Sequence, residues 1–207
     1  TIAEISAKTF RNWVNNVMTW GAGSGAAEVS NTNVAWVQNG ILSKYTGGAV
    51  ACYRCPADNF LATTQRKAGY PRRNRSISMN AYWGKVSPTA AATDSSYVNP
   101  LFKKFLKTTD CPTPTEVMVT LDEHADSIND GFFTIDPAGT GWGDLPASYH
   151  NGGGTFSFAD GHSEAHRWQG RGGNNATVQR VKYVGWPGGP GFKADYQWLA
   201  QRMSVKK

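Results

Sequence analysis

The sequence predicts an α+β fold, in which an antiparallel sheet packs against short helices. Two segments of alternating apolar and polar residues are joined by Asp160-Gly161, and this dipeptide favours a two-residue hairpin turn. Residues 116–121 and 132–135 are rich in β-branched and aromatic side chains, which predicts two further strands. No segment alternates strands and helices around a phosphate-binding glycine loop, so the order of elements favours helices on a meandering sheet.

Before the first strand, the chain reads as a lead-in, a helix and a loop-rich segment. Residues 1–25 carry apolar side chains at helical spacing but end in a glycine-rich turn, so we expect an irregular lead-in. Asn33 is a suitable helix cap, and apolar residues recur on one side until Gly47-Gly48. Residues 50–80 follow as a loop-rich segment that ends in a short alternating strand over 76–80.

The second half is predicted to add a short helix, the strands and a closing helix. Proline at the start of 99–106 favours a helix there, because proline is tolerated at the first helical position. Residues 178–184 predict a last strand, and apolar spacing predicts a closing helix through Tyr196, Leu199 and Met203. The 207 residues can bury one core, so we expect a single domain over 1–207.

The composition is that of a globular chain with a modest net charge of +6 and 40% hydrophobic residues. The basic residues are scattered, apart from Arg72-Arg73-Asn74-Arg75 and the terminal Lys206-Lys207, which we interpret as a solvated loop and a frayed end. No combination of aromatic and basic residues typical of RNA-binding sheets occurs, so we predict no nucleic-acid partner. No apolar run reaches the length of a membrane span, so we predict no membrane contact for this segment.

A two-residue loop at Asp160-Gly161 decides which hairpin residues share a face. It places Ala159 opposite His162 and Ser157 opposite Glu164. Since side chains alternate across a strand, one face would contribute to the core with Phe156, Phe158, Ser163 and Ala165. The other face would carry Ser157, Ala159, His162, Glu164, His166 and Trp168.

This polar face admits a structural and a metal-binding interpretation. In the first, Asp160 satisfies backbone groups of the turn, His150 hydrogen-bonds into it, and the remaining polar side chains are solvated. In the second, imidazoles and a carboxylate on one strand suit zinc or copper. The candidate ligands are His150, His162, Glu164 and His166, with His124 as the alternative to His150.

The segment after the strand at 116–121 is dense in carboxylates and predicts a different metal. Calcium takes six to eight oxygen ligands from carboxylates and carbonyls on loops. The acidic residues that offer such ligands are Asp122, Glu123, Asp126, Asp130 and Asp144.

Catalysis is the less favoured interpretation, because the usual nucleophile, zinc-protease and nucleotide motifs are missing. If the chain is an enzyme, Glu123 and Asp160 are the candidate carboxylate pair for glycoside cleavage, and His150 is a third catalytic candidate. Tryptophans flanked by glycine or proline are then the candidates for stacking on sugar rings. They are Trp83, Trp142 and Trp186.

Several stretches resemble one protein family. His150, followed after nine residues by Asp160-Gly161, is the motif of the prepilin-type, processing-associated proteins related to the major pseudopilins of type II secretion systems. The chain is most similar to the branch of this family from Verrucomicrobia and Planctomycetes. Further stretches that match, in the same order, are 53–58, 75–80, 121–131 and 195–202.

The resemblance implies a pseudopilin-like globular head that lacks its N-terminal anchor helix in the present sequence. It also implies a non-enzymatic subunit of a type II secretion or type IV pilus-like filament, whose partners are other pseudopilin or secretion subunits. Such a head is extracytoplasmic, either periplasmic or extracellular, and membrane-anchored in the full-length form. Major pseudopilins hold calcium in a C-terminal loop, which supports the calcium hypothesis. The alternative is a secreted domain on the same fold that binds polysaccharide or cleaves it with a metal.

The cysteine content is odd, with Cys52, Cys55 and Cys111. The spacing of the first two is compatible with zinc or redox chemistry, but one disulfide and one buried thiol is the favoured interpretation. The family match falls on Cys55-Pro56, so the resemblance implies a bridge between Cys55 and Cys111.

Overall fold

The computed structural model describes residues 12–14, 17–85, 97–139, 142–169 and 190–207. These residues form two compact units, each described separately below. Unit 1 contains the described residues up to Ile77, together with His124–Gly131. Unit 2 contains the other described residues. Each unit has a buried apolar cluster of its own, and the single domain over 1–207 stays a prediction.

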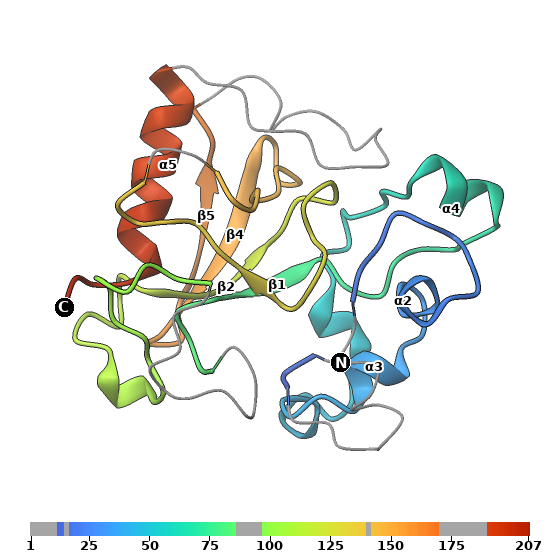
Figure 1. The fold of residues 1–207 in the computed structure, drawn as a ribbon, viewed down its shortest axis with the longest axis horizontal. Coiled ribbons are helices and arrows are strands. Elements are labelled where there is room, and N and C mark those ends of the chain that lie inside the picture. The colour runs from blue at the N-terminus through green and yellow to red at the C-terminus, as the bar shows by residue number, and fades with distance from the viewer. Residues whose placement is uncertain (1–11, 15–16, 86–96, 140–141, 170–189) are drawn as a thin grey trace. The chain divides into compact units, whose positions relative to one another are not determined.

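Unit 1 is built from short helices and turns (Figure 1). Its elements are α2 (Ala26–Val29), α3 (Ala35–Gln38), η1 (Ser43–Tyr45), η2 (Val50–Tyr53) and α4 (Thr63–Lys67). The Asn33 side chain accepts a hydrogen bond from the Ala35 N–H at 3.0 Å, close to the predicted start. The helix is shorter than predicted, because beyond Gln38 the chain bonds elsewhere and the Ile41 N–H donates to the Asn12 carbonyl at 2.9 Å.

The basic run in unit 1 is not a solvated loop, and that prediction is wrong. Arg75 is 0% exposed and Arg73 is 3% exposed, whereas Arg72 is exposed. Arg75 donates to the carbonyls of Ile77, at 2.6 Å, and of Asp130. Arg73 forms an ion pair with Asp58 at 3.3 Å. These acceptors bind the terminal guanidinium nitrogens, which offsets part of the cost of burying the charges, whereas the buried Arg73 Nε has no hydrogen-bond acceptor among the described residues.

Unit 2 contains a five-stranded mixed sheet (Figure 1). Its strands are β1 (Ile77–Asn80), β2 (Met118–Asp122), β3 (Phe132–Phe133), β4 (Gly153–Phe158) and β5 (Ser163–Arg167), in the order β3-β1-β2-β4-β5. The α+β class is confirmed, but the prediction of an antiparallel sheet is wrong because β1 and β3 pair in parallel. A parallel pair needs a long crossover, and here the chain between β1 and β3 contains β2 and the segment 124–131.

The predicted strands near residues 76–80, 116–121 and 132–135 are confirmed, whereas the prediction of a helix over 99–106 is wrong. Beyond a turn in which the Phe102 N–H donates to the Asn99 carbonyl at 3.1 Å, the backbone bonds to distant segments. The Lys103 N–H donates to the Val205 carbonyl at 2.9 Å, and the Phe105 N–H donates to the Tyr82 carbonyl at 2.8 Å. The predicted strand at 178–184 lies outside the described residues.

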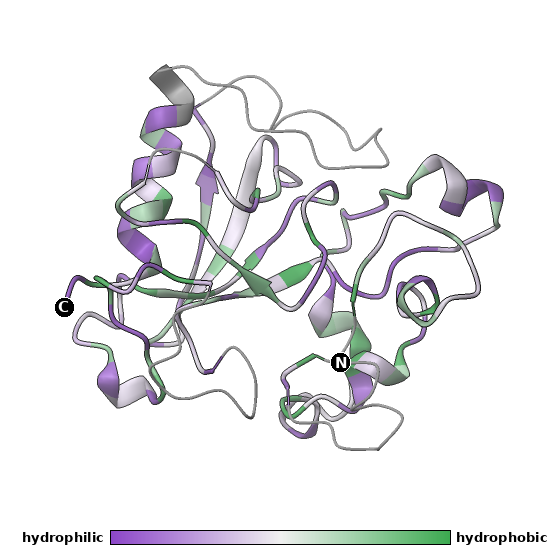
Figure 2. Ribbon diagram, viewed as in Figure 1, coloured by the Kyte–Doolittle hydropathy of each residue, from purple (hydrophilic) through white to green (hydrophobic). Residues whose placement is uncertain are grey.

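The closing helix is confirmed as α5 (Pro190–Met203), which lies beside β4 and β5 (Figure 1). Tyr196, Leu199 and Met203 are at most 3% exposed and belong to the same apolar cluster as Phe156 of β4. Figure 2 shows the hydrophobic colouring of β3 and the hydrophilic colouring of α4. Among the described residues, no helix has both the length and the apolar character that crossing a bilayer requires.

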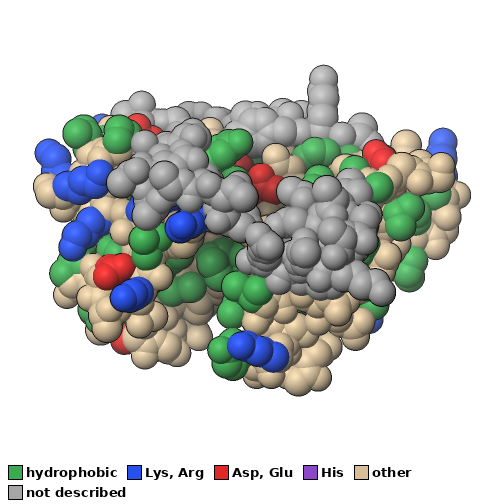
Figure 3. Space-filling model, turned by 60° about the horizontal axis from the view of Figure 1, so that its bottom comes forward, with side chains coloured by type: hydrophobic (Ala, Val, Ile, Leu, Met, Phe, Trp, Pro, Cys, Tyr) green, Lys and Arg blue, Asp and Glu red, His purple; other side chains and the backbone are tan. Residues whose placement is uncertain are grey.

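On the face shown in Figure 3, most of the visible Lys and Arg side chains lie toward the left edge, where hydrophobic, uncharged and acidic side chains lie between them.

Candidate functional site

His150, the first residue of the family motif, contacts Asp122 at the end of β2. Its Nε2 lies 3.0 Å from Asp122 Oδ2, so the ring N–H can donate to the carboxylate. The same oxygen accepts the Thr155 N–H at 3.3 Å and the Thr155 hydroxyl. The Asp122 side chain is 3% exposed and the His150 side chain 36% exposed. Asp122 therefore ties β2 to β4 and to the turn before it.

A tight turn places His150 beside this carboxylate. The His150 N–H donates to the Gly153 carbonyl at 3.0 Å, and the Gly153 N–H donates back at 3.1 Å. The two residues between them, Asn151 and Gly152, have φ values of 52° and 80°. Positive φ at both central positions is what a type I′ turn requires, and Asn-Gly is its preferred sequence. That dipeptide is the signal through which the turn could have been found in the sequence.

Asp160 lies in the turn at the other end of β4, as the structural interpretation predicts. Its Oδ1 accepts the His162 N–H at 3.1 Å and lies 2.6 Å from His162 Nδ1. Hydrogen bonding from the His162 side chain, then from its backbone, lowers the pKa of Asp160. The His162 ring also stacks on Phe158, with centroids 4.3 Å apart. The expected hydrogen bond from His150 into this turn is replaced by its contact with Asp122.

The hairpin register differs by one residue from the prediction. Ser157 pairs with Ser163 and Phe156 with Glu164, because the loop has three residues, ending in Gly161 at φ 96°. The Gly161 N–H donates to the Phe158 carbonyl, and the Phe158 N–H donates to the His162 carbonyl, both at 3.0 Å. A slip of one residue moves every side chain of a strand to the other face. Glu164 and His166 therefore share the face of Phe156, and the predicted polar face is wrong.

His166 consequently packs between β5 and α5. Its ring stacks on Trp198 with centroids 3.6 Å apart, and its Nε2 lies 3.8 Å from Asp195. Burial lowers the pKa of His166, Asp195 opposes that shift, and Arg202 adds to it. Arg202 lies over the Trp198 ring at 4.0 Å and pairs with Glu164 at 3.6 Å. The aromatic and charged groups here hold the helix on the sheet.

The candidate transition-metal ligands are therefore dispersed. His150 contacts Asp122, His162 contacts Asp160, and His166 and Glu164 face α5. In unit 1, the His124 Nδ1 accepts the Asp126 N–H at 3.1 Å. Within either unit, as far as the chain is described, no three of the candidate ligands lie close enough to hold one ion.

The candidate calcium ligands are also divided. Asp122, Glu123 and Asp144 belong to unit 2, whereas Asp126 and Asp130 belong to unit 1. Asp144 Oδ2 accepts the Thr134 N–H at 2.6 Å, and the Asp144 N–H donates to the Thr134 carbonyl at 3.1 Å, so this residue closes a loop. The three members in unit 2 do not form one cluster of oxygen ligands within the described chain.

The candidate carboxylate pair for glycoside cleavage lies at opposite ends of β2. Glu123, 1% exposed, follows the strand and forms an isolated bridge with Pro146. Asp160 lies at the other end, where its N–H donates to the Pro114 carbonyl at 3.2 Å and Ala159 bonds to Val117. Six residues of extended chain from Val117 to Glu123 span roughly 20 Å. Catalytic pairs of this type are about 5–10 Å apart, so the two residues do not fit that role.

No protein-family model matches the chain, and neither a curated protein nor a solved structure matches it significantly.

Of the three tryptophans predicted to stack on sugar rings, the two that the structure describes, Trp83 and Trp142, pack against the core of unit 2. Trp83 donates its indole N–H to the Met118 carbonyl at 2.8 Å and lies 4.8 Å from Phe105. Trp142 meets Tyr196 edge to face at 5.1 Å. Both indoles are therefore used in packing, and Trp186 lies outside the described residues.

No disulfide joins Cys55 and Cys111 in the structure, so the predicted bridge is not formed. Cys55 is 6% exposed and Cys111 is 7% exposed, each within a different unit. The backbone of Cys55 is held through its N–H, which donates to the Ser76 hydroxyl at 2.7 Å. The two thiols thus contribute to separate interiors.

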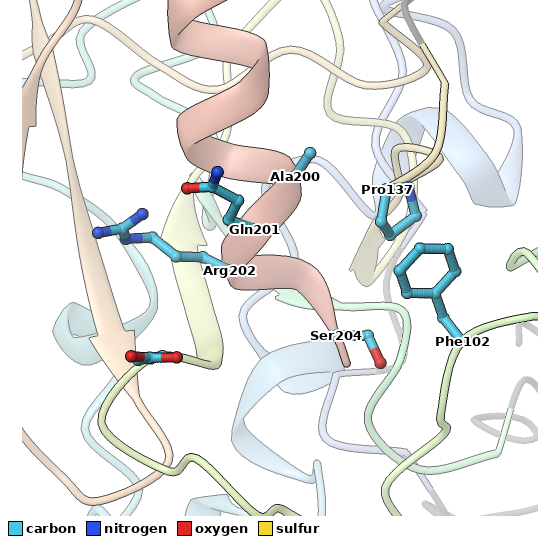
Figure 4. Close-up of a pocket in the computed structure, with 7 residues that line it drawn as sticks. Phe102, Pro137, Ala200, Gln201, Arg202 and Ser204 are labelled. Atoms are coloured by element: carbon cyan, nitrogen blue, oxygen red, sulfur yellow. The ribbon is translucent and has the colours of Figure 1, made fainter. Parts of the chain in front are cut away.

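A pocket of about 490 Å³ lies at the C-terminal end of α5. Figure 4 shows Phe102 and Pro137 beside one another on one side, while Gln201 and Arg202 point away from them. Ser204 Oγ donates to the Lys103 carbonyl at 2.6 Å. The remaining lining residues are Ala200 and Glu116. The lining does not combine a nucleophile, a base and an orienting group, which acyl or glycosyl transfer would need.

Proposed function

We propose that this chain is the globular head of a pseudopilin-like filament subunit and acts through contacts with neighbouring subunits, without catalytic turnover. The sequence motif supplies the family resemblance, and the structural use of that motif is the observation that carries the proposal. His150 stands before β4, and Asp160-Gly161 follows it. The nine residues between them are Asn151-Gly152 of the turn, the six residues of β4, and Ala159.

The nine-residue spacing of the motif therefore corresponds to the two central residues of the turn, the strand β4 and Ala159. At one end His150 binds Asp122, and at the other end Asp160 binds His162. Both contacts hold a turn that flanks β4, which is the role expected of a motif that supports the fold. A catalytic motif would instead bring its two polar groups to one reaction centre.

The proposal places the chain outside the cytoplasm, with other pseudopilin or secretion subunits as its partners. Metal binding is not part of it, because the described candidate ligands do not gather within one unit. Calcium, zinc and copper binding stay predictions. Chelation followed by thermal unfolding tests them, and an unchanged melting temperature would exclude a structural ion.

Cross-linking in the producing cell tests the filament proposal. Cys52 is exposed whereas Cys55 and Cys111 are buried, so a Cys52→Ser background is suitable. Single cysteines at Ser163 and Ala165, which are exposed on β5, are then treated with a bismaleimide in cells that make the full-length protein. We expect a ladder of cross-linked multimers in the extracytoplasmic fraction. Monomers at both positions, or a cytoplasmic protein, would contradict the proposal.

The polysaccharide alternative predicts a different result for the purified chain. Under our proposal, incubation with a panel of acidic and neutral polysaccharides should release no sugar and should leave the melting temperature unchanged. Sugar release that survives purification to homogeneity would favour the enzyme and would overturn the non-enzymatic assignment.

A further inference from the structure

Unit 1 contains a pocket of about 340 Å³ that is lined by arginine and apolar side chains. Its volume lies at the small end of the range for small-molecule sites, roughly 300–1,000 Å³. Its polar lining is provided by Arg54, Arg72, Arg73, Thr32 and Asn74. Its apolar lining is provided by Val34, Val50, Ala51, Pro56 and Pro71. Every lining residue belongs to unit 1.

The positive charges in this pocket exceed the negative charges beside them. Three arginines line the pocket, and Arg73 is paired with Asp58, with N and O 3.3 Å apart. Both side chains of that pair are at most 2% exposed. Arg54 Nη1 donates to the Asp58 backbone carbonyl, at 3.1 Å. Arg72 has no carboxylate within ion-pair distance in the described part of the chain. Arg54 and Arg72 thus add two charges that the neighbouring protein groups do not neutralise.

Arg54 and Arg72 also act on one another. Arg54 is half-buried, and burial lowers its pKa, with the charge of Arg72 as the next cause in the same direction. Holding two like charges together costs free energy in the unliganded protein. An anion bound between them would remove that cost and would accept several charge-assisted hydrogen bonds.

Hydrogen bonds hold the backbone beside Arg54 and the segment that follows Arg72 and Arg73. The Ser76 N–H donates to the Tyr53 carbonyl at 3.1 Å, and the Cys55 N–H donates to the Ser76 hydroxyl at 2.7 Å. The Asn74 side chain donates to the carbonyls of Ser30 and Asn33 at 3.0 and 2.9 Å. These bonds join the segment that carries Arg54 to the segment 74–76, and they join Asn74 of the pocket wall to residues 30–33. A preorganised site of this kind loses less conformational entropy when it binds a ligand.

We propose that this pocket binds an oxyanion carried by a small, partly apolar ligand, with Arg54 and Arg72 as the anion-binding residues. The guanidinium fork matches the geometry of carboxylates and phosphates. Val34, Val50, Pro56 and Pro71 offer contact to an apolar body beside the anionic group. The proposal is independent of the filament function, because it concerns other residues in the other unit.

Anion-dependent stabilisation of the purified protein tests this site. The probes are inorganic phosphate and N-acetyl-leucine, which distinguish a phosphate from a carboxylate with an apolar body, and sodium chloride keeps the ionic strength constant. We expect at least one probe to raise the melting temperature in a saturable manner. Arg54→Gln and Arg72→Gln should each weaken the fitted affinity by about 10- to 100-fold, the usual effect of losing a charged hydrogen-bond donor.

Arg66→Gln is the matched control, because Arg66 is an exposed arginine of unit 1 on α4, outside the pocket. This variant should keep the affinity of the parent protein. Arg72→Gln should not lower the unliganded melting temperature, since Arg72 is exposed and its loss removes a like charge beside Arg54, so a lost response cannot be attributed to misfolding. No saturable response to either probe, or an equal loss in all three variants, would overturn the proposal.

Discussion

The carboxylate of Asp122, at the end of β2, lies 3.0 Å from the imidazole of His150 and accepts two further hydrogen bonds from Thr155. One buried oxygen therefore connects β2, β4 and the turn that precedes β4. The neighbouring Ala147 N–H donates to the Asp122 carbonyl at 2.8 Å, and the Trp168 indole donates to the Ala147 carbonyl at 2.8 Å. Ala147, in the segment before β4, is therefore hydrogen-bonded to β2 through its N–H and to Trp168 through its carbonyl.

Replacing Asp122 should destabilise unit 2. In Asp122→Ala, the amide and hydroxyl of Thr155 lose their acceptor in a buried place, and the free energy of unfolding should fall by about 2–3 kcal/mol. Urea unfolding monitored by tryptophan fluorescence measures the change. His150→Ala, which removes only the half-exposed partner, should cost less than Asp122→Ala. Equal stability of the Asp122→Ala variant and the parent would show that the hydrogen bonds of the Asp122 carboxylate do not contribute to the stability of unit 2.

The stability of the protein should fall as the pH decreases below about 6.5 because of His166. Burial lowers the pKa of His166 in the folded state, whereas the pKa of a histidine in the unfolded chain is about 6.5. Between these two values the unfolded state binds more protons, so stability is present above pH 6.5 and is lost as the pH falls towards the folded pKa. One proton gives at most about 1.4 kcal/mol per pH unit. Unfolding free energies from pH 5 to 8 provide the measurement.

His166→Gln removes the titrating ring and should flatten this dependence, although the lost stacking on Trp198 lowers stability at every pH. His162→Gln is the control, because it removes a histidine from the same hairpin and leaves His166 in place. The explanation fails if His166→Gln keeps the slope of the parent protein.

Gly161 should tolerate substitution poorly, because its φ of 96° is rarely adopted by other residues. Gly161→Ala should reduce the free energy of unfolding by about 1–2 kcal/mol. Gly161→Asn should cost less, since asparagine is enriched at positive φ. No atom lies within 4 Å of a Cβ built at this position, so the cost reports backbone conformation and not a steric clash. Thermal unfolding compares the two variants, and a Gly161→Ala protein as stable as the parent would contradict this interpretation of the loop.

The hairpin also shows how far the sequence could predict the candidate site. Asp160-Gly161 correctly predicts a turn between β4 and β5, but the dipeptide is shared by two-residue loops and by three-residue loops that end in a glycine. The difference of one residue decides whether His166 is a solvated ligand or a partner of Trp198. That outcome depends on the packing of β5 against α5, which lies more than 20 residues further along the chain. The turn at Asn151-Gly152, by contrast, can be predicted from local sequence alone.

Local sequence patterns could not predict the parallel pairing of β1 with β3 or the burial of Arg73 and Arg75. β3 has only two residues, and its neighbour is β1 instead of a strand adjacent in sequence. Arg73 and Arg75 look like a charged surface loop, yet the distant carbonyls of Ala125 and Asp130 and the carboxylate of Asp58 accept hydrogen bonds from them. Such acceptors are brought together only when the chain folds, so composition assigns these residues to solvent.

Arg75 should therefore be the residue of the basic run that matters most for folding. Arg75→Met leaves buried carbonyl groups, including that of Ile77, without their charged donor, and should cost about 2–4 kcal/mol. Arg75→Lys should recover only part of this loss, because one ammonium cannot reproduce the planar fork of the guanidinium. Arg72→Gln, at an exposed position, should change stability by less than about 0.5 kcal/mol.

Hydrogen exchange is the suitable measurement for the Arg75 variants, because it reports the local stability of the segment that carries Arg75. The amides to follow are those of Asn74 and Ser76, which donate to the Asn31 and Tyr53 carbonyls at 2.8 and 3.1 Å. Both should exchange faster in Arg75→Met than in Arg72→Gln, because the segment that carries them loses its buried anchor. Unchanged protection of both amides in Arg75→Met would assign the stability of unit 1 to its apolar cluster of Val14, Val37 and Tyr53.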